Sequence, residues 1–192
     1  MKTVKIHRLI ISLLLVAAIT ASGEKEAVLD FLGRPVLFGE QYLIRVDYGK
    51  FIDIVEEGWI NHAGVPLSAC PEYVSINGDI PDYVTFDSLS SSYLQVLRVS
   101  TEINIYFPWR KRHCDLTLSG YWKAKGGLVG LSGSEFHNDS FFTIEKYNGS
   151  YRLAFKGAEI VARLHGANTL ILTSEVPPPP MYYRRFNVSF VR

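Results

Sequence analysis

The sequence predicts an all-β domain, and three observations lead to this prediction. Short runs rich in Val, Ile, Tyr and Phe follow one another along the chain and are separated by Gly, Pro, Asn or Ser. Punctuated runs of this kind are typical of antiparallel strands. Residues 141–155 read FFTIEKY, then Asn-Gly, then SYRLAF, which is the pattern of a two-residue hairpin. After residue 23, apolar residues rarely recur at the three- and four-residue intervals of an amphipathic helix.

The first 23 residues have the composition of a secretory signal peptide rather than of a strand. A basic beginning is followed by an apolar run of 13 residues, Leu9 to Ala21, and by small residues up to Gly23. The alternative is a membrane anchor, but a helix needs about 20 apolar residues to cross a bilayer. We therefore expect cleavage near Gly23 and secretion, to the extracellular space or the vacuole, with no membrane attachment.

The remaining residues, 24–192, have the length of a single domain, and no shift of composition marks a second one. Three of the 20 Lys and Arg residues and none of the 19 Asp and Glu residues lie before residue 24, so the formal charge of the rest is −2. A nearly neutral chain gives no reason to expect nucleic acid as a partner. We expect a monomer.

Turn and strand signals place individual elements in chain order. An Asp, a Gly and a Pro within residues 30–35 predict a reverse turn, and residues 42–46 predict the first core strand. In residues 102–107, three large apolar side chains alternate with Glu, Asn and Tyr, which predicts one buried face. Residues 159–164 are the one run with some helical character, but their flanking glycines favour a strand. Residues 176–180 end in four prolines and predict an extended segment.

The chain has two cysteines, Cys70 and Cys114. In an exported protein such a pair predicts one disulfide, and the alternative is two free thiols. The bridge would close a loop of about 45 residues and stabilise the fold by roughly 4 kcal/mol. His113 precedes Cys114, but successive side chains of an extended chain point to opposite faces, so we do not expect a catalytic cysteine.

Three asparagines begin the sequence pattern of N-glycosylation, namely Asn138, Asn148 and Asn187. Each is a candidate glycan site if it lies on the surface. Asn148 also belongs to the predicted hairpin turn, which would expose it. Asn187 is the weakest candidate, because its neighbours predict a strand.

Near the start of the predicted domain, a turn and the strand after it contain seven notable positions, namely Val28, Asp30, Gly33, Arg34, Val36, Tyr42 and Ile44. Their types and spacing resemble the N-terminal signature of the plant Kunitz, or soybean-trypsin-inhibitor-like, family. Later segments of the same family are resembled by three further stretches, namely Ala69-Cys70-Pro71, the 141–155 hairpin and the closing run FNVSFV. Most of residues 24–192 is therefore covered by the resemblance.

The resemblance implies a β-trefoil fold and a protease inhibitor of plant defence. It also implies that Cys70–Cys114 is the first disulfide of the family. A second bridge found in many members is absent here, since no further cysteine is present.

The resemblance further implies a protease-binding loop between Phe86 and Gln95. Its candidate contact residues are Ser88, Leu89, Ser90, Ser91, Ser92, Tyr93 and Leu94. Residues 87–94 contain no Arg or Lys, and the buried aspartate of a trypsin pocket would stay unpaired, so we do not expect trypsin inhibition. Tyr93, Leu89 or Leu94 would suit an apolar pocket. The asparagine that braces the loop in the family aligns with Phe38, which cannot donate a side-chain hydrogen bond.

The remaining polar residues predict neither catalysis nor a cofactor or metal site, because the histidines lack the spacing of metal ligands and no nucleophile motif is present. Arg110-Lys111-Arg112 is either a second inhibitory loop or a solvated edge. Our leading hypothesis is an inhibitor of a serine or cysteine protease. The alternative is a non-inhibitory protein on the same scaffold that binds a carbohydrate, a small molecule or a protein.

Overall fold

The computed structural model describes residues 24–56, 71–76, 82–88, 93–108, 120–131, 134, 137–163, 169–173 and 183–192. The regular elements within these residues are all β-strands, which confirms the predicted all-β class. They are β1 Gln41–Val46, β2 Ile52–Glu56, β3 Pro71–Ile76, β4 Val84–Asp87, β5 Asn104–Tyr106, β6 Lys123–Lys125, β7 Leu128–Gly130, β8 Thr143–Tyr147, β9 Ser150–Phe155, β10 Ala158–Arg163, β11 Leu170–Leu172, β12 Tyr183–Arg184 and β13 Val188–Val191. A helix long and apolar enough to span a membrane is not found in the described part of the chain.

Six of the strands form a closed ring. β1 pairs with both β13 and β4, β4 pairs with β5, and β9 pairs with both β13 and β8. The ring is closed where the ends of β5 and β8 meet, at an antiparallel bridge between Ile103 and Phe142. Closure gives each of these strands a neighbour on both sides and so leaves no open sheet edge.

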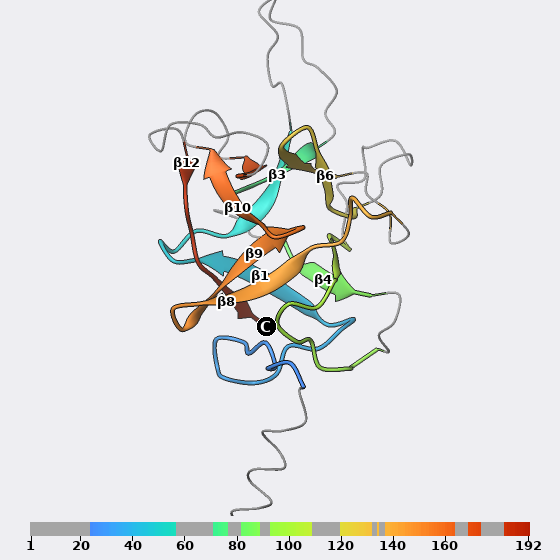
Figure 1. Ribbon diagram of the computed structural model, residues 1–192, viewed down its shortest axis with the longest axis vertical. Helices are drawn as coiled ribbons and strands as arrows, with labels where there is room; N and C mark the ends of the chain where they lie inside the picture. Colours follow the sequence, from blue (N-terminus) through green and yellow to red (C-terminus); the bar gives the residue numbers. More distant parts are fainter. Residues whose placement is uncertain are drawn as a thin grey trace, which may run out of the picture.

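Six of the seven other strands form three hairpins that meet one another, and β12 pairs with β10. The hairpins are β2–β3, β6–β7 and β10–β11. Their inner strands are joined by the pairs Tyr73 with Gly130, Leu128 with Ile171, and Ser75 with Thr169. In Figure 1 the labelled strands β3, β6 and β10 of these hairpins lie above the ring strands β1, β4 and β8. The molecule is therefore a barrel with a triangle of hairpins at one end.

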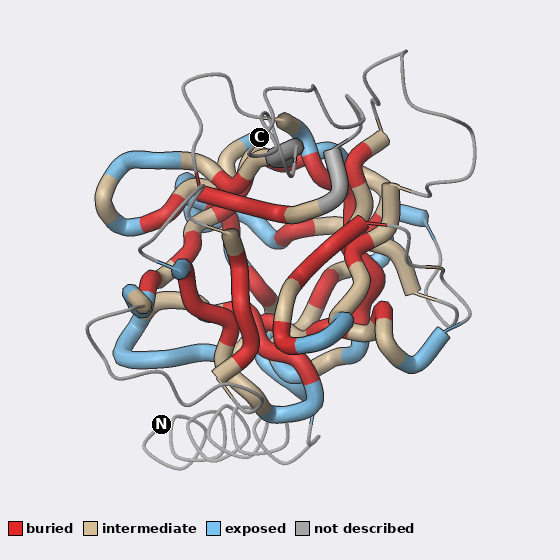
Figure 2. Tube along the Cα trace, turned by 90° about the horizontal axis from the view of Figure 1, so that it is seen from above, coloured by how far each residue is buried: buried red, intermediate tan, exposed pale blue. Residues whose placement is uncertain are grey.

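Buried stretches run through much of the described chain, as Figure 2 shows. The buried apolar residues form one cluster, to which both the ring strands and the hairpins contribute. The predicted strand at residues 42–46 lies within β1, where Tyr42, Ile44 and Val46 are buried while Leu43 and Arg45 between them are partly exposed. The largest fully buried side chains are Trp122, Tyr42, Phe86, Phe142, Phe186 and Phe190. Large aromatic side chains contribute most to the apolar area that such a core buries.

The predicted alternation of residues 102–107 is confirmed for its apolar members and incomplete for its polar ones. Ile103, Ile105 and Phe107 are buried, but Asn104 is fully buried as well. Its Nδ2 donates a hydrogen bond to the carbonyl oxygen of Ser140 at 2.9 Å, which satisfies the buried amide donor.

The predicted turns also form. Asn148 and Gly149 have φ angles of 47° and 80° and connect β8 to β9 through the pair Tyr147 with Ser150, as a two-residue hairpin requires. In the predicted reverse turn, the Gly33 N–H donates to the Asp30 carbonyl at 3.0 Å. The run with helical character is strand β10, as its flanking glycines indicated.

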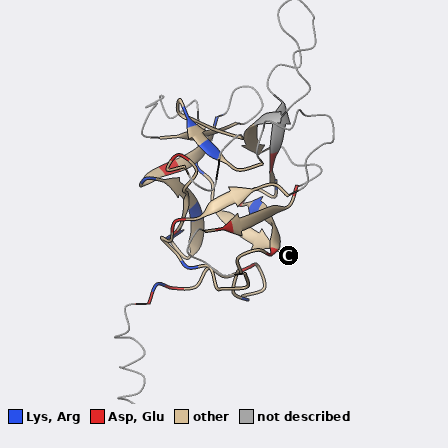
Figure 3. Cartoon of the chain, turned by 90° about the vertical axis from the view of Figure 1, so that its right-hand side faces the viewer, with Lys and Arg blue, Asp and Glu red and all other residues tan. Residues whose placement is uncertain are grey.

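Described charges of both signs are spread over several strands, as the view in Figure 3 shows. Several of them form ion pairs, for example Arg152 and Arg185 with Glu159, and Arg192 with Glu40. The pairs made by the more exposed Arg185 and Arg192 contribute little to stability individually.

Several predictions fall on residues outside the described part. These are the signal peptide of residues 1–23, the disulfide of Cys70 and Cys114, the basic run Arg110-Lys111-Arg112, and the proline run that follows Val176. They stay predictions.

Candidate functional site

The predicted protease-binding loop leaves the barrel at the end of β4 and returns at Tyr93. Ser88, Tyr93 and Leu94 are described, whereas Leu89, Ser90, Ser91 and Ser92 lie outside the described residues. The structure therefore defines the two ends of the loop and the residues that hold them.

Both ends of the loop are bonded to the same dipeptide, Phe38–Gly39. The Gly39 N–H donates to the Phe86 carbonyl at 3.0 Å, on the outgoing side. On the returning side, the Leu94 N–H donates to the Phe38 carbonyl at 3.0 Å and the Phe38 N–H donates to the Gln95 carbonyl at 2.9 Å. We call residues 36–39 the backbone clamp, because the next step of the same pairing joins the Leu97 N–H to the Val36 carbonyl at 2.8 Å.

Gly39 lets the ring of Tyr93 lie directly on the clamp. Its φ of +79° belongs to the left-handed region that favours glycine, and a Cβ placed on it would lie 2.1 Å from Cδ2 and 2.4 Å from Cε2 of Tyr93. Tyr93 is 70% exposed, so one side of its ring rests on the clamp while much of it faces solvent. The structure thus places Tyr93 at the foot of the loop.

The core fixes the position of the clamp. Phe38 is buried, so its side chain belongs to the core and not to the loop, which agrees with the predicted loss of a polar brace. The buried Tyr42 hydroxyl accepts a hydrogen bond from the Leu37 N–H at 3.1 Å, and its ring packs on that of Phe86, 6.0 Å between centroids. One aromatic side chain therefore connects the clamp to the strand from which the loop departs.

Sequence reasoning missed the clamp. The loss of the side-chain brace pointed to a loosely held loop, whereas main-chain hydrogen bonds hold both of its ends. The glycine that follows Phe38 was the available signal, since a glycine next to a buried aromatic residue is typical of a close backbone approach.

An acidic group lies where the loop begins. Asp87 ends β4, and its Oδ2 accepts a hydrogen bond from the Tyr121 hydroxyl at 3.3 Å. Burial raises the pKa of the neighbouring Tyr106, the negative charge of Asp87 raises it further, and a hydrogen bond with Thr85 opposes the change. The ring centroids of Tyr106 and Tyr121 lie 4.9 Å apart. The two residues also form an antiparallel bridge beside the start of the loop.

The three glycosylation candidates lie in different surroundings. Asn138 and Asn148 are exposed. Asn187 is partly buried, and its Oδ1 accepts a hydrogen bond from Arg152 Nε at 3.2 Å. The described residues contain no cluster of His, Cys, Asp and Glu that could hold a metal ion.

Comparison with solved structures identifies the fold. The chain is similar to a Kunitz-type cysteine protease inhibitor from potato, at 17% identity and a TM-score of 0.65, over 88% of this chain and 99% of that one. It is similar to a Kunitz-type trypsin inhibitor from Cicer arietinum, at 21% identity and a TM-score of 0.61, over 86% and 98% of the two chains. It is also similar to the water-soluble chlorophyll protein of Brassica oleracea var. botrytis, at 21% identity and a TM-score of 0.62, over 88% and 99%. The ring and its three hairpins are thus a β-trefoil, as the resemblance implied.

Comparison at the sequence level identifies the family. No curated protein sequence matches the chain. Residues 28–169 match the model of the legume Kunitz family, which is described as trypsin and protease inhibitor. The match includes the backbone clamp, both ends of the predicted loop and the 141–155 hairpin. The chain therefore belongs to the plant Kunitz family of trypsin and protease inhibitors.

Proposed function

We propose that this protein is a secreted inhibitor of a protease with an apolar specificity pocket, and that residues 87–94 form its contact loop. The observation that supports this proposal most directly is the bonding of both loop ends to Phe38–Gly39. The proposed activity is inhibition by binding, with no catalysis by this chain.

A closed loop base favours tight binding. Ordering a flexible backbone costs about 1–2 kcal/mol per residue, so a loop whose ends are already held loses less entropy when a protease binds it. Here three main-chain hydrogen bonds and the contact of Tyr93 with Gly39 hold the ends. The missing asparagine brace is therefore compatible with an inhibitory loop.

Leu89 is the residue that we propose enters the pocket of the protease. Tyr93 is held against Gly39, and the other residues between 88 and 92 are serines. Leu89 is thus the one large side chain of that stretch, and it suits the apolar pocket of a chymotrypsin-like or subtilisin-like enzyme. Because the stretch has no Lys or Arg, trypsin itself would bind poorly.

Titration of the mature protein against trypsin, chymotrypsin, subtilisin and a papain-like protease tests the proposal. We expect stoichiometric inhibition of an enzyme with an apolar pocket and none of trypsin. Leu89→Ala should weaken that inhibition. Leu89→Lys should transfer it to trypsin, because the lysine would pair with the buried aspartate of the trypsin pocket. Absence of inhibition of all four enzymes at micromolar protein would contradict the proposal.

A second candidate function is binding of a small molecule without inhibition. It is favoured by the shared fold with water-soluble chlorophyll proteins and by the absence of a basic residue in the loop. Absorbance and mass spectrometry of the protein purified from a plant secretory host would detect a retained ligand. A ligand together with no inhibition would favour this second function.

The proposal includes export and a domain that begins near residue 24. The segment that starts there packs on the domain: the Val99 N–H donates to the Glu26 carbonyl at 2.9 Å, and Lys146 forms an ion pair with Glu26. Cleavage near Gly23 would leave this segment intact. N-terminal sequencing of the secreted protein checks the cleavage point, and an unprocessed start at Met1 would contradict it.

A further inference from the structure

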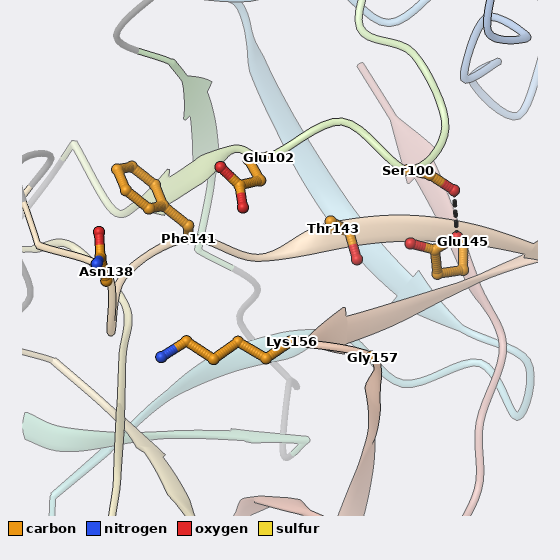
Figure 4. Close-up of a pocket in the computed structure, with 8 residues that line it drawn as sticks. All are labelled: Ser100, Glu102, Asn138, Phe141, Thr143, Glu145, Lys156 and Gly157. Carbon is orange, nitrogen blue, oxygen red and sulfur yellow. Dashed lines mark hydrogen bonds between the residues drawn. The ribbon is translucent and has the colours of Figure 1, made fainter.

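A half-open pocket of about 480 Å³ lies on the side of the barrel, between three segments of the chain (Figure 4). Its lining comes from the segment before β5, from residues 138–145, which lead into β8, and from the turn between β9 and β10. The lining residues are Ser100, Glu102, Asn138, Phe141, Thr143, Glu145, Lys156 and Gly157. The volume lies within the range of about 300–1,000 Å³ that is usual for small-ligand sites.

One wall of the pocket follows from the alternation of strand β8. Phe142 and Ile144 are fully buried in the core, so Phe141, Thr143 and Glu145 point to the opposite face, where the pocket lies. This wall therefore presents a partly buried aromatic ring, a hydroxyl group and a carboxylate in a row.

Groups of both charges lie on the two sides of this wall. In Figure 4, Glu102 from the segment before β5 lies on one side of β8, and Lys156 from the two-residue turn between β9 and β10 lies on the other. Glu145 is held in place, since it accepts a hydrogen bond from the hydroxyl of Ser100. An aromatic face surrounded by several donors and acceptors suits a sugar ring, whose C–H face packs on the ring and whose hydroxyls bond to the polar groups.

Asn138 stands at the rim of this pocket on a firmly held turn. The Ser140 N–H donates to the His137 carbonyl at 2.9 Å, and the Ala124 N–H donates to the Asp139 carbonyl at 2.8 Å. The Ser140 hydroxyl is fully buried and accepts a hydrogen bond from the Ser134 N–H at 3.0 Å. Asn138 itself is exposed, so a group attached to it would start from a defined position beside the pocket.

We propose that Asn138 carries an N-glycan whose first N-acetylglucosamine lies in this pocket against Phe141. This inference rests on the export that is part of the proposed function. Oligosaccharyl transfer joins Asn138 Nδ2 to the anomeric carbon of the sugar and breaks the bond from that carbon to the diphosphate of the lipid-linked donor. The lipid diphosphate leaves, and the amide proton is released with it.

A shallow, polar pocket is sufficient to hold this sugar, because the sugar is covalently attached beside it. A half-open site binds a free sugar weakly, but a sugar tethered at the rim has an effective concentration in the millimolar range or above. The attached sugar would cover the exposed part of Phe141 and contact three segments that are distant in sequence. The other two candidates lie in other surroundings, because Asn148 is at a hairpin tip and the Asn187 side chain accepts a hydrogen bond from Arg152.

Secretion from a glycosylating host under a heterologous leader tests the proposal separately from the chain's own signal peptide and from inhibition. Mass spectrometry of the glycopeptides should find Asn138 occupied, and Asn138→Gln should remove that signal. Asn138→Gln is the suitable variant, since replacing the buried Ser140 would disturb the turn. An unoccupied Asn138 would overturn the proposal.

Release of the glycan by a peptide-N-glycosidase tests whether the sugar lies in the pocket. In the native protein, release at Asn138 should be about two- to tenfold slower than at the exposed Asn148, or than at Asn138 after denaturation, as an aromatic contact allows. Phe141→Leu should remove most of this protection while filling similar space, and Phe141→Tyr should retain it. Equal rates for wild type and Phe141→Leu would overturn the placement of the sugar.

Discussion

The ring of Tyr93 lies against the main chain of Gly39, so closely that a Cβ on Gly39 would be 2.1 Å from Cδ2 of Tyr93. The two residues lie far apart in the sequence, at the clamp and at the returning end of the predicted loop. Their contact depends on the absence of a side chain at residue 39. It connects the stability of the fold to the geometry of the loop.

Replacing Gly39 by alanine should therefore damage both stability and the proposed inhibition. The positive φ alone costs about 1–2 kcal/mol for a residue with a Cβ, and the Tyr93 ring must also move. Gly49→Ala is a matched control, since Gly49 has a φ of +80° and no atom within 4 Å of its added Cβ. Urea unfolding and inhibition should both show a larger loss for Gly39→Ala than for Gly49→Ala.

A double variant isolates the contact itself. Tyr93→Ala in the Gly39→Ala background should restore part of the lost stability, because the clash is gone while the backbone strain stays. Strictly additive losses would show that the ring does not press on residue 39.

Because of Asp30, the free energy of unfolding of the domain should vary with pH in the acid range. Burial raises the pKa of this carboxyl, but hydrogen bonds from the main chain and side chain of Arg34 and from the Leu32 N–H, together with the Arg34 charge, lower it below the usual 3.8. A pKa lowered on folding stabilises the folded state above the unfolded pKa. That stabilisation is lost as the pH falls through the lower folded value.

Asp30→Asn should consequently be less stable than wild type at pH 7, by about 1–3 kcal/mol, and the difference should shrink as the pH falls below about 4. Denaturant unfolding between pH 2 and pH 7 measures it. Glu102→Gln, which changes an exposed carboxylate, should differ little from wild type at any pH. A pH-independent difference for Asp30→Asn would contradict the ionic role.

Asn104 should contribute more to the stability of the fold than an exposed polar residue of a short strand does, because its side chain is buried and hydrogen-bonded. Its replacement by alanine removes the donor to the Ser140 carbonyl and leaves a void, at a cost of about 1–3 kcal/mol. Lys125→Ala, at an exposed side chain on β6, should change the free energy of unfolding by less than about 0.5 kcal/mol. Similar values for the two variants would show that the buried hydrogen bond is not needed.

The predicted bridge between Cys70 and Cys114 can be tested without a structure. Alkylation under denaturing, non-reducing conditions should label no thiol in the secreted protein. Replacement of both cysteines by alanine should lower the free energy of unfolding by roughly 4 kcal/mol. Two labelled thiols would refute the bridge.

Local sequence was sufficient for the elements whose partners are close in the chain. The Asn148-Gly149 turn, the Asp30–Gly33 turn and strand β10 were all predicted, because their backbone conformations depend on residues only a few positions apart. The first core strand, predicted at residues 42–46, was found for the same reason. The family and its fold were recognised from several such local patterns taken together, and the matched family model confirms them.

The tertiary structure alone decided which distant segments meet. Strand alternation placed Asn104 on the solvent face, yet the turn of Ser140, 36 residues later, covers it and accepts its hydrogen bond. In the same way, the clamp meets both ends of a loop more than 45 positions away, and the pocket beside Asn138 is lined from three separate segments. These contacts follow from the order in which the strands close the barrel, and no short-range pattern encodes that order. By itself, then, the sequence determined several of the strands and turns, and the family. Barrel closure decided how the loop is held and where the pocket lies.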